Sequence, residues 1–126
     1  MKESKKGFKR FIKSFGYAIE GIKSSLKNEQ NIIVMFIAGI IAVILGFILK
    51  ISSFEWLILL LLIGFILSLE MINTAIEATV NLHDGESKSK YGKIAKDSAS
   101  AALLIISIFS IIIGIIIIIP KILELF

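Results

Sequence analysis

Three long runs of apolar residues constrain this chain more than any other feature. Ile32–Leu49 holds 18 consecutive uncharged residues and Ala99–Ile119 holds 21, which correspond to about 27 and about 31 Å of helix. Both runs are long enough to span most or all of the ~30 Å hydrocarbon core of a bilayer. The middle run, Trp56–Leu69, has 14 residues, about 21 Å, and is too short. Its helix can cross only if it continues through the polar residues that follow, Glu70 and Asn73.

We therefore expect one all-α membrane domain over residues 1–126, with spans at about 32–49, 56–80 and 98–119. The absence of cysteine excludes disulfides and thiolate chemistry, and one histidine cannot form a histidine cluster. Ser52 and Ser53 predict a very short outer loop, and the polar stretch 82–95 predicts a longer cytoplasmic one. Three spans form a thin bundle, and small residues recur along the third span, so we expect an oligomer.

The positive charges predict the orientation of the chain. Residues 1–30 carry eight lysines and arginines and residues 81–97 carry four, whereas the opposite side has only Lys50 and Lys121. The positive-inside rule places the N-terminus and the 81–97 loop in the cytoplasm and the C-terminus outside. Because the charge flanks the membrane, no nucleic-acid partner is expected.

The segment 5–28 has the pattern of an amphipathic helix. Phe8, Phe11, Phe15 and Ile19 recur at three- and four-residue steps, and lysines and Arg10 occupy the remaining positions. Such a helix lies on the cytoplasmic leaflet, with its apolar face in the acyl boundary and its cations near anionic headgroups. We hypothesise from this amphipathic pattern that the helix acts as a lid or gate at the membrane surface.

The segment LEMINTAIEATVN, residues 69–81, carries a polar stripe. Glu70, Asn73, Thr74, Glu77 and Asn81 fall within about 100° of one helix face. An ionisable residue at mid-membrane costs roughly 2.5–3.5 kcal/mol, so the stripe must face a bundle interior, a partner subunit or a wet pocket. Depth separates the carboxylates, because Glu70 lies about 21 Å along the helix from Trp56 and Glu77 about 32 Å.

Three interpretations of the stripe remain open from spacing alone. It can be a polar seam that joins an oligomer, which explains the amides better than two glutamates. It can be a proton or cation relay, although the other two spans offer almost no deeper polar groups. It can be an active site at one interface, together with the loop lysines and Glu29.

Three segments, GYAIEGIKSSLKNE, LEMINTAIEATVN and AKDSASAALL, resemble the bacterial integral-membrane diacylglycerol kinase family, which includes undecaprenol kinases. The specific pattern is E-x-x-N-[ST]-A-I-E, followed about twenty residues later by A-K-D. The resemblance implies a homotrimer in the bacterial cell membrane with composite active sites at the cytoplasmic interface. It also implies transfer of a phosphoryl group from ATP to a lipid hydroxyl, with undecaprenol as the expected acceptor and diacylglycerol as the alternative. The alternative outside the class of lipid kinases is a non-catalytic or transport oligomer.

The resemblance also implies roles for single residues. Glu70 is expected to be the general base, and Asn73 to position phosphate or metal in the catalytic centre. Magnesium is the expected cofactor, held by Glu29 and Glu77 and bridged to ATP. The expected nucleotide contacts are Arg10, Tyr17, Glu29, Glu77, Glu86, Lys96 and Asp97, with Lys96 on phosphate and Asp97 on ribose. Glu70 and Ser100 are expected to line the lipid site.

Two positions depart from the family pattern. Asn81 stands where the family usually has aspartate, so a charge beside the site is missing. Ser87 and Lys88 follow Glu86 in place of a Tyr-His pair, and the loop is one residue longer. Both departures bear on how this chain holds a nucleotide.

Overall fold

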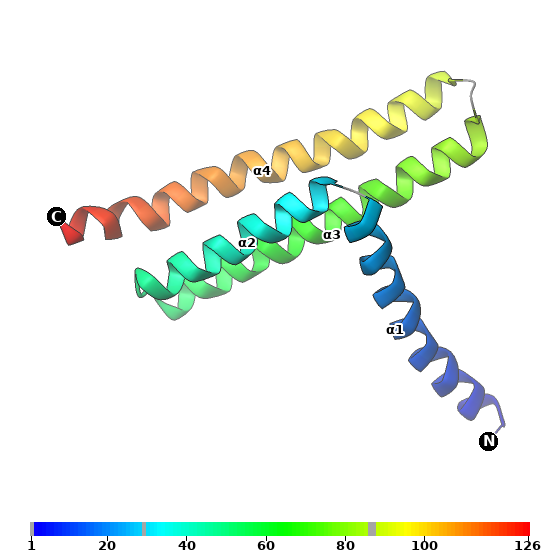
Figure 1. Ribbon diagram of the computed structural model, residues 1–126, viewed down its shortest axis with the longest axis horizontal. Helices are drawn as coiled ribbons and strands as arrows, with labels where there is room; N and C mark the ends of the chain where they lie inside the picture. The colour runs from blue at the N-terminus through cyan, green and yellow to red at the C-terminus, as the bar shows by residue number, and fades with distance from the viewer. Residues whose placement is uncertain (1, 29, 86–87) are drawn as a thin grey trace.

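The computed structural model describes residues 2–28, 30–85 and 88–126, and the side chains within 5–27, 30–85 and 88–126. The elements are four helices, α1 (Lys2–Asn28), α2 (Gln30–Ile48), α3 (Ser53–Asp84) and α4 (Lys90–Leu125). No strand occurs in these ranges, so the all-α prediction is confirmed. Figure 1 shows α2, α3 and α4 running roughly alongside one another, whereas α1 leaves the other three at a steep angle.

Three of the helices are long and apolar enough to cross a membrane. The 19 residues of α2, the 32 of α3 and the 36 of α4 correspond to about 29, 48 and 54 Å. As predicted, α3 remains helical through Glu70 and Asn73. Because α3 and α4 are much longer than the ~30 Å core, part of each extends beyond it.

The C-terminal end of the long α1 helix lies beside the other helices (Figure 1), and the described side chains of α1 before Ser25 are exposed. The side chains of Phe8, Phe11 and Phe15 are more than half exposed, and the rings of Phe11 and Phe15 meet edge to face at 5.1 Å. Ser25, near the end of the helix, is buried. The predicted N-terminal helix is present, and its apolar face is left uncovered by this chain.

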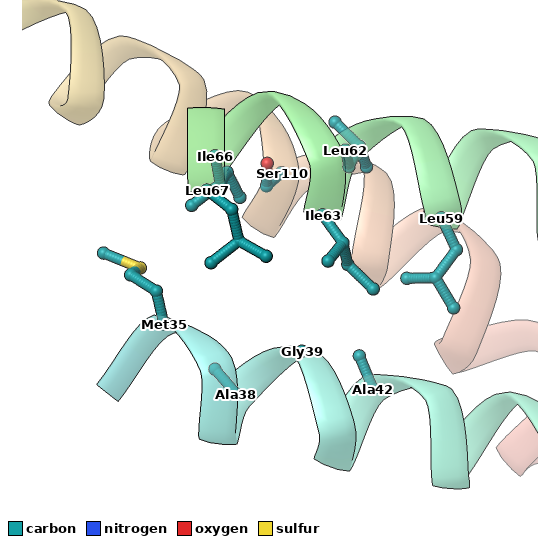
Figure 2. A pocket seen from close by; sticks show the side chains of 10 residues that line it. All are labelled: Met35, Ala38, Gly39, Ala42, Leu59, Leu62, Ile63, Ile66, Leu67 and Ser110. Carbon is teal, nitrogen blue, oxygen red and sulfur yellow. The ribbon is translucent and has the colours of Figure 1, made fainter. Parts of the chain in front are cut away.

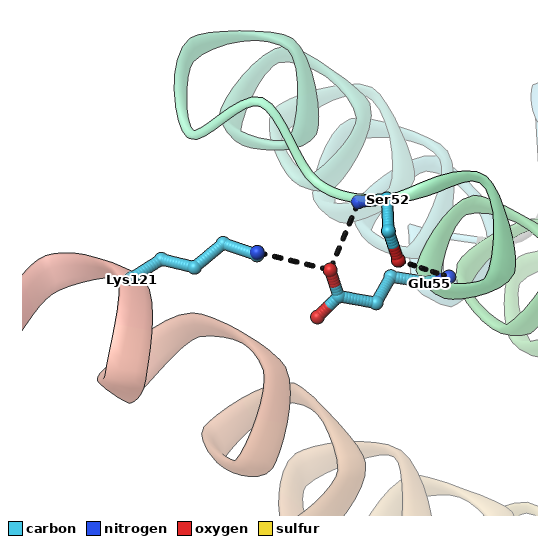
Figure 3. Close-up of polar contacts among 3 residues, drawn as sticks. All are labelled: Ser52, Glu55 and Lys121. Atoms are coloured by element: carbon cyan, nitrogen blue, oxygen red, sulfur yellow. Dashed lines mark hydrogen bonds and ion pairs between the residues drawn. The ribbon is translucent and has the colours of Figure 1, made fainter. Parts of the chain in front are cut away.

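A short turn joins α2 to α3 as expected. Lys50 adopts a left-handed backbone conformation, with φ +52°, and Ser52 caps α3. The Ser52 hydroxyl accepts a hydrogen bond from the Glu55 N–H at 3.2 Å, and Glu55 Oε1 accepts from the Ser52 N–H at 2.9 Å. The same carboxylate oxygen lies 3.0 Å from Lys121 Nζ of α4, as Figure 3 shows. One glutamate thus caps α3 and ties its start to the end of α4.

Small residues on α2 let α3 approach closely. A Cβ atom at Gly46 would lie 2.7 Å from the Trp56 ring, which also packs against Phe47 at 4.8 Å between ring centroids. Further along α2, Ala38 and Gly39 border an apolar pocket of about 140 Å³ whose other walls come from α3 and α4 (Figure 2). The contact between α2 and this part of α3 is therefore close and apolar.

The expectation of a loop over 82–95 is wrong in its extent. The α3 helix continues to Asp84 and α4 begins at Lys90. Gly85, with φ +59°, ends α3, and its N–H donates to the Asn81 carbonyl at 2.9 Å. Ser89 is the N-cap of α4. Polar side chains alone do not end a helix. The capping residues Gly85 and Ser89 therefore define the short connection between α3 and α4.

Candidate active site

The polar stripe on α3 is buried at its first two residues, half-buried at Thr74 and Glu77, and exposed at Asn81. Glu70 is 2% exposed and Asn73 is 7% exposed, and they are the two buried side chains of this helix. Figure 1 shows the end of α1 and the start of α2 beside the middle of α3, and α1 contacts both of these helices. Ser25 and Ile32, on those two segments, are buried as well. The burial of a carboxylate in such a thin bundle marks this part of α3 as more than a lipid-facing surface.

One turn further along, Asn73 and Glu77 form a pair of oxygen-bearing side chains. Asn73 Nδ2 donates a hydrogen bond to Glu77 Oε1 at 3.4 Å. The other polar atom of Asn73, Oδ1, is buried and accepts no hydrogen bond from any residue that the structure describes. A buried amide oxygen normally has a donor or a metal ion beside it. Here that oxygen is adjacent to a carboxylate.

The facing ends of α3 and α4 enclose a polar cleft of about 580 Å³. Four lysines and two aspartates contribute to its walls. The lining residues are Val80, Asn81, Asp84, Gly85, Lys88, Ser89, Lys90, Gly92, Lys93, Lys96 and Asp97. The excess of ammonium groups suits an anionic ligand such as a polyphosphate.

Two short polar contacts fix the side chains in this cleft. Lys96 Nζ of α4 donates to Asn81 Oδ1 of α3 at 2.6 Å. Lys93 Nζ pairs with Asp97 Oδ2, also at 2.6 Å, one turn along α4. The first contact holds the Lys96 ammonium with a neutral partner, so the charge of Lys96 is not cancelled there. The second contact is largely exposed, with side chains 77% and 64% accessible, and contributes little to stability.

At the mouth of the cleft, Asp84 and Ser89 join the two helix ends. The Ser89 hydroxyl donates to the Asp84 carboxylate, with oxygen distances of 2.9 and 3.0 Å, and accepts from the Gly92 N–H at 2.9 Å. The Ser89 N–H also points at Asp84 Oδ2, at 3.4 Å. Gly92 is buried beneath this arrangement. The last turn of α3 and the first turn of α4 are therefore held in direct contact.

The predicted site residues fall into separate groups in one chain. Glu70, Asn73 and Glu77 share one face of α3, and Lys96 and Asp97 line the cleft beyond them. Exposed side chains that do not reach the cleft are Arg10, Tyr17 and Ser100. Glu29 and Glu86 lie outside the described residues, so their predicted contacts are not tested. Among the described residues no group of three or more metal-ligating side chains occurs.

Sequence reasoning missed part of the cleft. It treated Lys88, Lys90 and Lys93 as charges that orient the chain, and it assigned no role to Asp84, Ser89 or Gly92. A signal was present for Ser89 alone, because serine is a preferred N-cap residue. The contact between Asn81 and Lys96 had no such signal, since it depends on how α3 and α4 are aligned.

Fold and site together define a class: a three-span membrane protein whose polar site lies towards one end of the bundle, with a buried carboxylate and a lysine-lined cleft. Comparison with known proteins agrees with this class. Residues 16–118 match the prokaryotic diacylglycerol kinase family. The chain belongs to this family.

Named relatives cover nearly all of the chain. It is 39% identical over 120 residues to the undecaprenol kinase of Bacillus subtilis, a match that spans 95% of this chain and 97% of that protein. It is 32% identical to the diacylglycerol kinase of Escherichia coli strain K12, over 84% of this chain and 86% of the relative. A diacylglycerol kinase of Helicobacter pylori is 35% identical over 82% of this chain and 80% of its own length. The prediction of a membrane lipid kinase is confirmed, and kinase chemistry implies ATP as the phosphoryl donor.

Proposed function

We propose that this protein transfers the γ-phosphoryl group of ATP to the hydroxyl of undecaprenol at the cytoplasmic face of a bacterial membrane. The similarity to an undecaprenol kinase over almost the whole chain supports this acceptor. Diacylglycerol is the second candidate, because other relatives are diacylglycerol kinases. Both acceptors place a hydroxyl near the membrane interface, so the same arrangement of protein groups serves either one.

The observation that carries the proposal is the buried Glu70 carboxylate, on the same face of α3 as Glu77 and Asn73. Glu70 lies about 10 Å of helix rise below Glu77, and about 16 Å below Asn81 in the cleft. A lipid hydroxyl beside Glu70 would give up its proton to the carboxylate as it attacks the phosphoryl group. Phosphoryl transfer otherwise depends on positioning and neutralisation of charge, which the lysines supply.

The cleft between α3 and α4 receives the nucleotide. Lys96, held by Asn81 without loss of charge, binds phosphate oxygens. Asp97 is the candidate for ribose, and its ion pair with Lys93 sets the direction of its carboxylate. Because the cleft is open and polar, ATP enters from the water phase while the lipid stays in the bilayer.

Magnesium fits the oxygen atoms that the structure brings together beside the cleft. Asn73 Oδ1, buried and without a hydrogen-bond donor among the described residues, and the Glu77 carboxylate are both hard oxygen ligands. Glu29, outside the described residues, is the second proposed carboxylate. When bound, the ion neutralises charge on the phosphates of ATP. Manganese titration followed by electron paramagnetic resonance tests this assignment without turnover: Glu77→Gln should weaken binding at least tenfold, and unchanged affinity would contradict it.

A single chain leaves the proposed site incomplete. Arg10 and Tyr17 are exposed on α1 and do not line the cleft, so their predicted nucleotide contacts require a second copy of the chain. A homotrimer with sites shared between neighbouring chains would supply these contacts. Chemical cross-linking in detergent should stop at the trimer.

The acceptor is tested with purified protein, labelled ATP and magnesium, with undecaprenol or diacylglycerol presented in separate micelles. The proposal predicts labelled lipid phosphate from undecaprenol with the higher kcat/KM. A preference for diacylglycerol would replace the acceptor and leave the site intact. No labelled product from either lipid would refute the proposed reaction.

A further inference from the structure

We propose that Asp84, Ser89 and Gly92 form a clamp that positions the lysine wall of the nucleotide cleft, so that they control ATP binding without contacting the reacting atoms. This inference rests on the proposed binding of ATP between α3 and α4. The clamp is the set of contacts among the Asp84 carboxylate, the Ser89 hydroxyl and the Gly92 N–H. These are positioning residues rather than catalytic residues.

The hydroxyl of Ser89 makes contacts with both helices. It donates its one proton to the carboxylate at the end of α3 and accepts a backbone N–H in the first turn of α4. The Ser89 side chain therefore connects the two walls of the cleft. This contact adds to the short segment that joins Asp84 to Ser89 along the chain. An N-cap hydroxyl normally serves its own helix alone. Here the capping hydroxyl of Ser89 also donates a hydrogen bond to Asp84 of the neighbouring helix.

Gly92 allows the ends of α3 and α4 to approach closely. A Cβ atom at this position would overlap Asp84 Oδ2, and it would lie 2.8 Å from Ser89 Oγ and 2.9 Å from Val80 Cγ1. Every non-glycine residue would therefore push α4 away from α3 or break the contacts of the carboxylate. The backbone of Gly92 has no left-handed conformation to explain the choice, so close approach is the reason for glycine here.

The clamp lies beside the lysines of the cleft. Lys88 and Lys90 flank Ser89, and Lys93 follows Gly92, so three of the four lysines of the cleft stand within one residue of a clamp residue. Displacing the first turn of α4 displaces their ammonium groups together. The remaining lysine, Lys96, is held separately by Asn81. The clamp and the Asn81–Lys96 contact thus position different lysines of the cleft.

The chain offers a matched control for this proposal. Ser52 is also a serine N-cap of a long helix, with a hydroxyl that accepts a backbone N–H, but it lies at the opposite end of α3. Ser52→Ala and Ser89→Ala each remove one capping hydroxyl, so general loss of helix stability affects both. Only Ser89→Ala changes the cleft.

The test measures KM for ATP, kcat and KM for the lipid in Ser89→Ala, Ser89→Thr, Gly92→Ala and Ser52→Ala. We expect Ser89→Ala and Gly92→Ala to raise KM for ATP about fivefold to tenfold, with kcat and the lipid KM within about twofold. Ser89→Thr keeps the hydroxyl and should restore the KM, and Ser52→Ala should leave it unchanged. Equal changes in Ser52→Ala, or a normal KM in Ser89→Ala, would overturn the proposal.

A second measurement separates failure of the clamp from failure of the proposed reaction. Amide hydrogen exchange in residues 90–93 reports the first turn of α4 and needs neither ATP nor lipid. Ser89→Ala should accelerate that exchange about tenfold, whereas Ser52→Ala should accelerate exchange only near residue 55. If the wild-type protein phosphorylates no lipid but the two variants show the expected changes in exchange, the proposed reaction is refuted and the proposed clamp is supported. If exchange at 90–93 is unaltered, the clamp is refuted whatever the enzyme does.

Discussion

Replacement of Glu70 by glutamine is the sharpest test of the proposed chemistry. Glu70 is 2% exposed within α3, and glutamine has nearly the same size and keeps hydrogen-bonding capacity. We therefore expect the free energy of unfolding to change by no more than about 1 kcal/mol. The variant loses the carboxylate's ability to accept a proton. Stability and proton transfer are thus separated at one position.

The expected loss follows from the role of a general base. Such a group contributes a factor of about 10² to 10⁴ in rate, equivalent to about 2.7–5.4 kcal/mol of activation free energy. ATP affinity should change less than about twofold, because the proposed ATP contacts of Lys96 and Asp97 lie in the cleft and do not involve Glu70. Lipid phosphorylation with labelled ATP gives kcat, and calorimetric titration gives the dissociation constant for ATP.

Two comparisons make the Glu70 prediction refutable. Glu124→Gln changes an exposed carboxylate at the other end of α4 and should leave kcat and ATP affinity as in the wild type. Glu77→Gln should instead weaken metal-dependent ATP binding. A Glu70→Gln variant with more than a tenth of the wild-type kcat would exclude a base at this position. Equal losses of ATP affinity in Glu70→Gln and Glu77→Gln would contradict the division of roles along α3.

Three further outcomes are expected from the structure. Asn81→Ala removes the 2.6 Å partner of Lys96 and should raise KM for ATP about threefold to tenfold, whereas Asn81→Asp keeps an acceptor for Lys96 and should impair binding less; the KM for ATP checks both. Glu55→Gln weakens the 3.0 Å contact with Lys121 and should slightly lower the midpoint of thermal unfolding in detergent, with kcat unchanged. Phe11→Glu places a charge on the exposed apolar face of α1 and should reduce activity on lipid in vesicles more than activity on a short-chain alcohol; an equal effect would exclude a lid.

Much of the fold follows from the length of the apolar runs. Trp56–Leu69 is too short to span, and this arithmetic alone requires that α3 continue through Glu70, as it does. The turn at Ser52 was also predictable, because a serine with a glutamate three residues later is a capping-box signal. The sequence does not predict the C-terminal end of α3 or the start of α4, because the polarity of residues 82–95 indicates a loop there. Polarity alone does not end a helix, and α3 ends at Gly85, which adopts a positive φ.

Some features of the candidate site follow from the local sequence, and others depend on contacts between residues far apart in the chain. Helical periodicity places Glu70, Asn73 and Glu77 on one face, and the structure confirms burial of the first two. The register of α3 against α4 is set by packing between residues far apart in the chain, and so the contact of Asn81 with Lys96 could not be read from spacing.

This distinction explains the departure at Asn81. By sequence, an asparagine in place of aspartate reads as a charge lost from the site. In the structure the amide oxygen still accepts the hydrogen bond from Lys96, and the ammonium keeps its full charge for an anion. The cleft already contains Asp84 and Asp97, each in contact with a residue of its wall. A third carboxylate would repel a polyphosphate, because both carry negative charge. Asparagine at position 81 holds Lys96 in place without adding that repulsion.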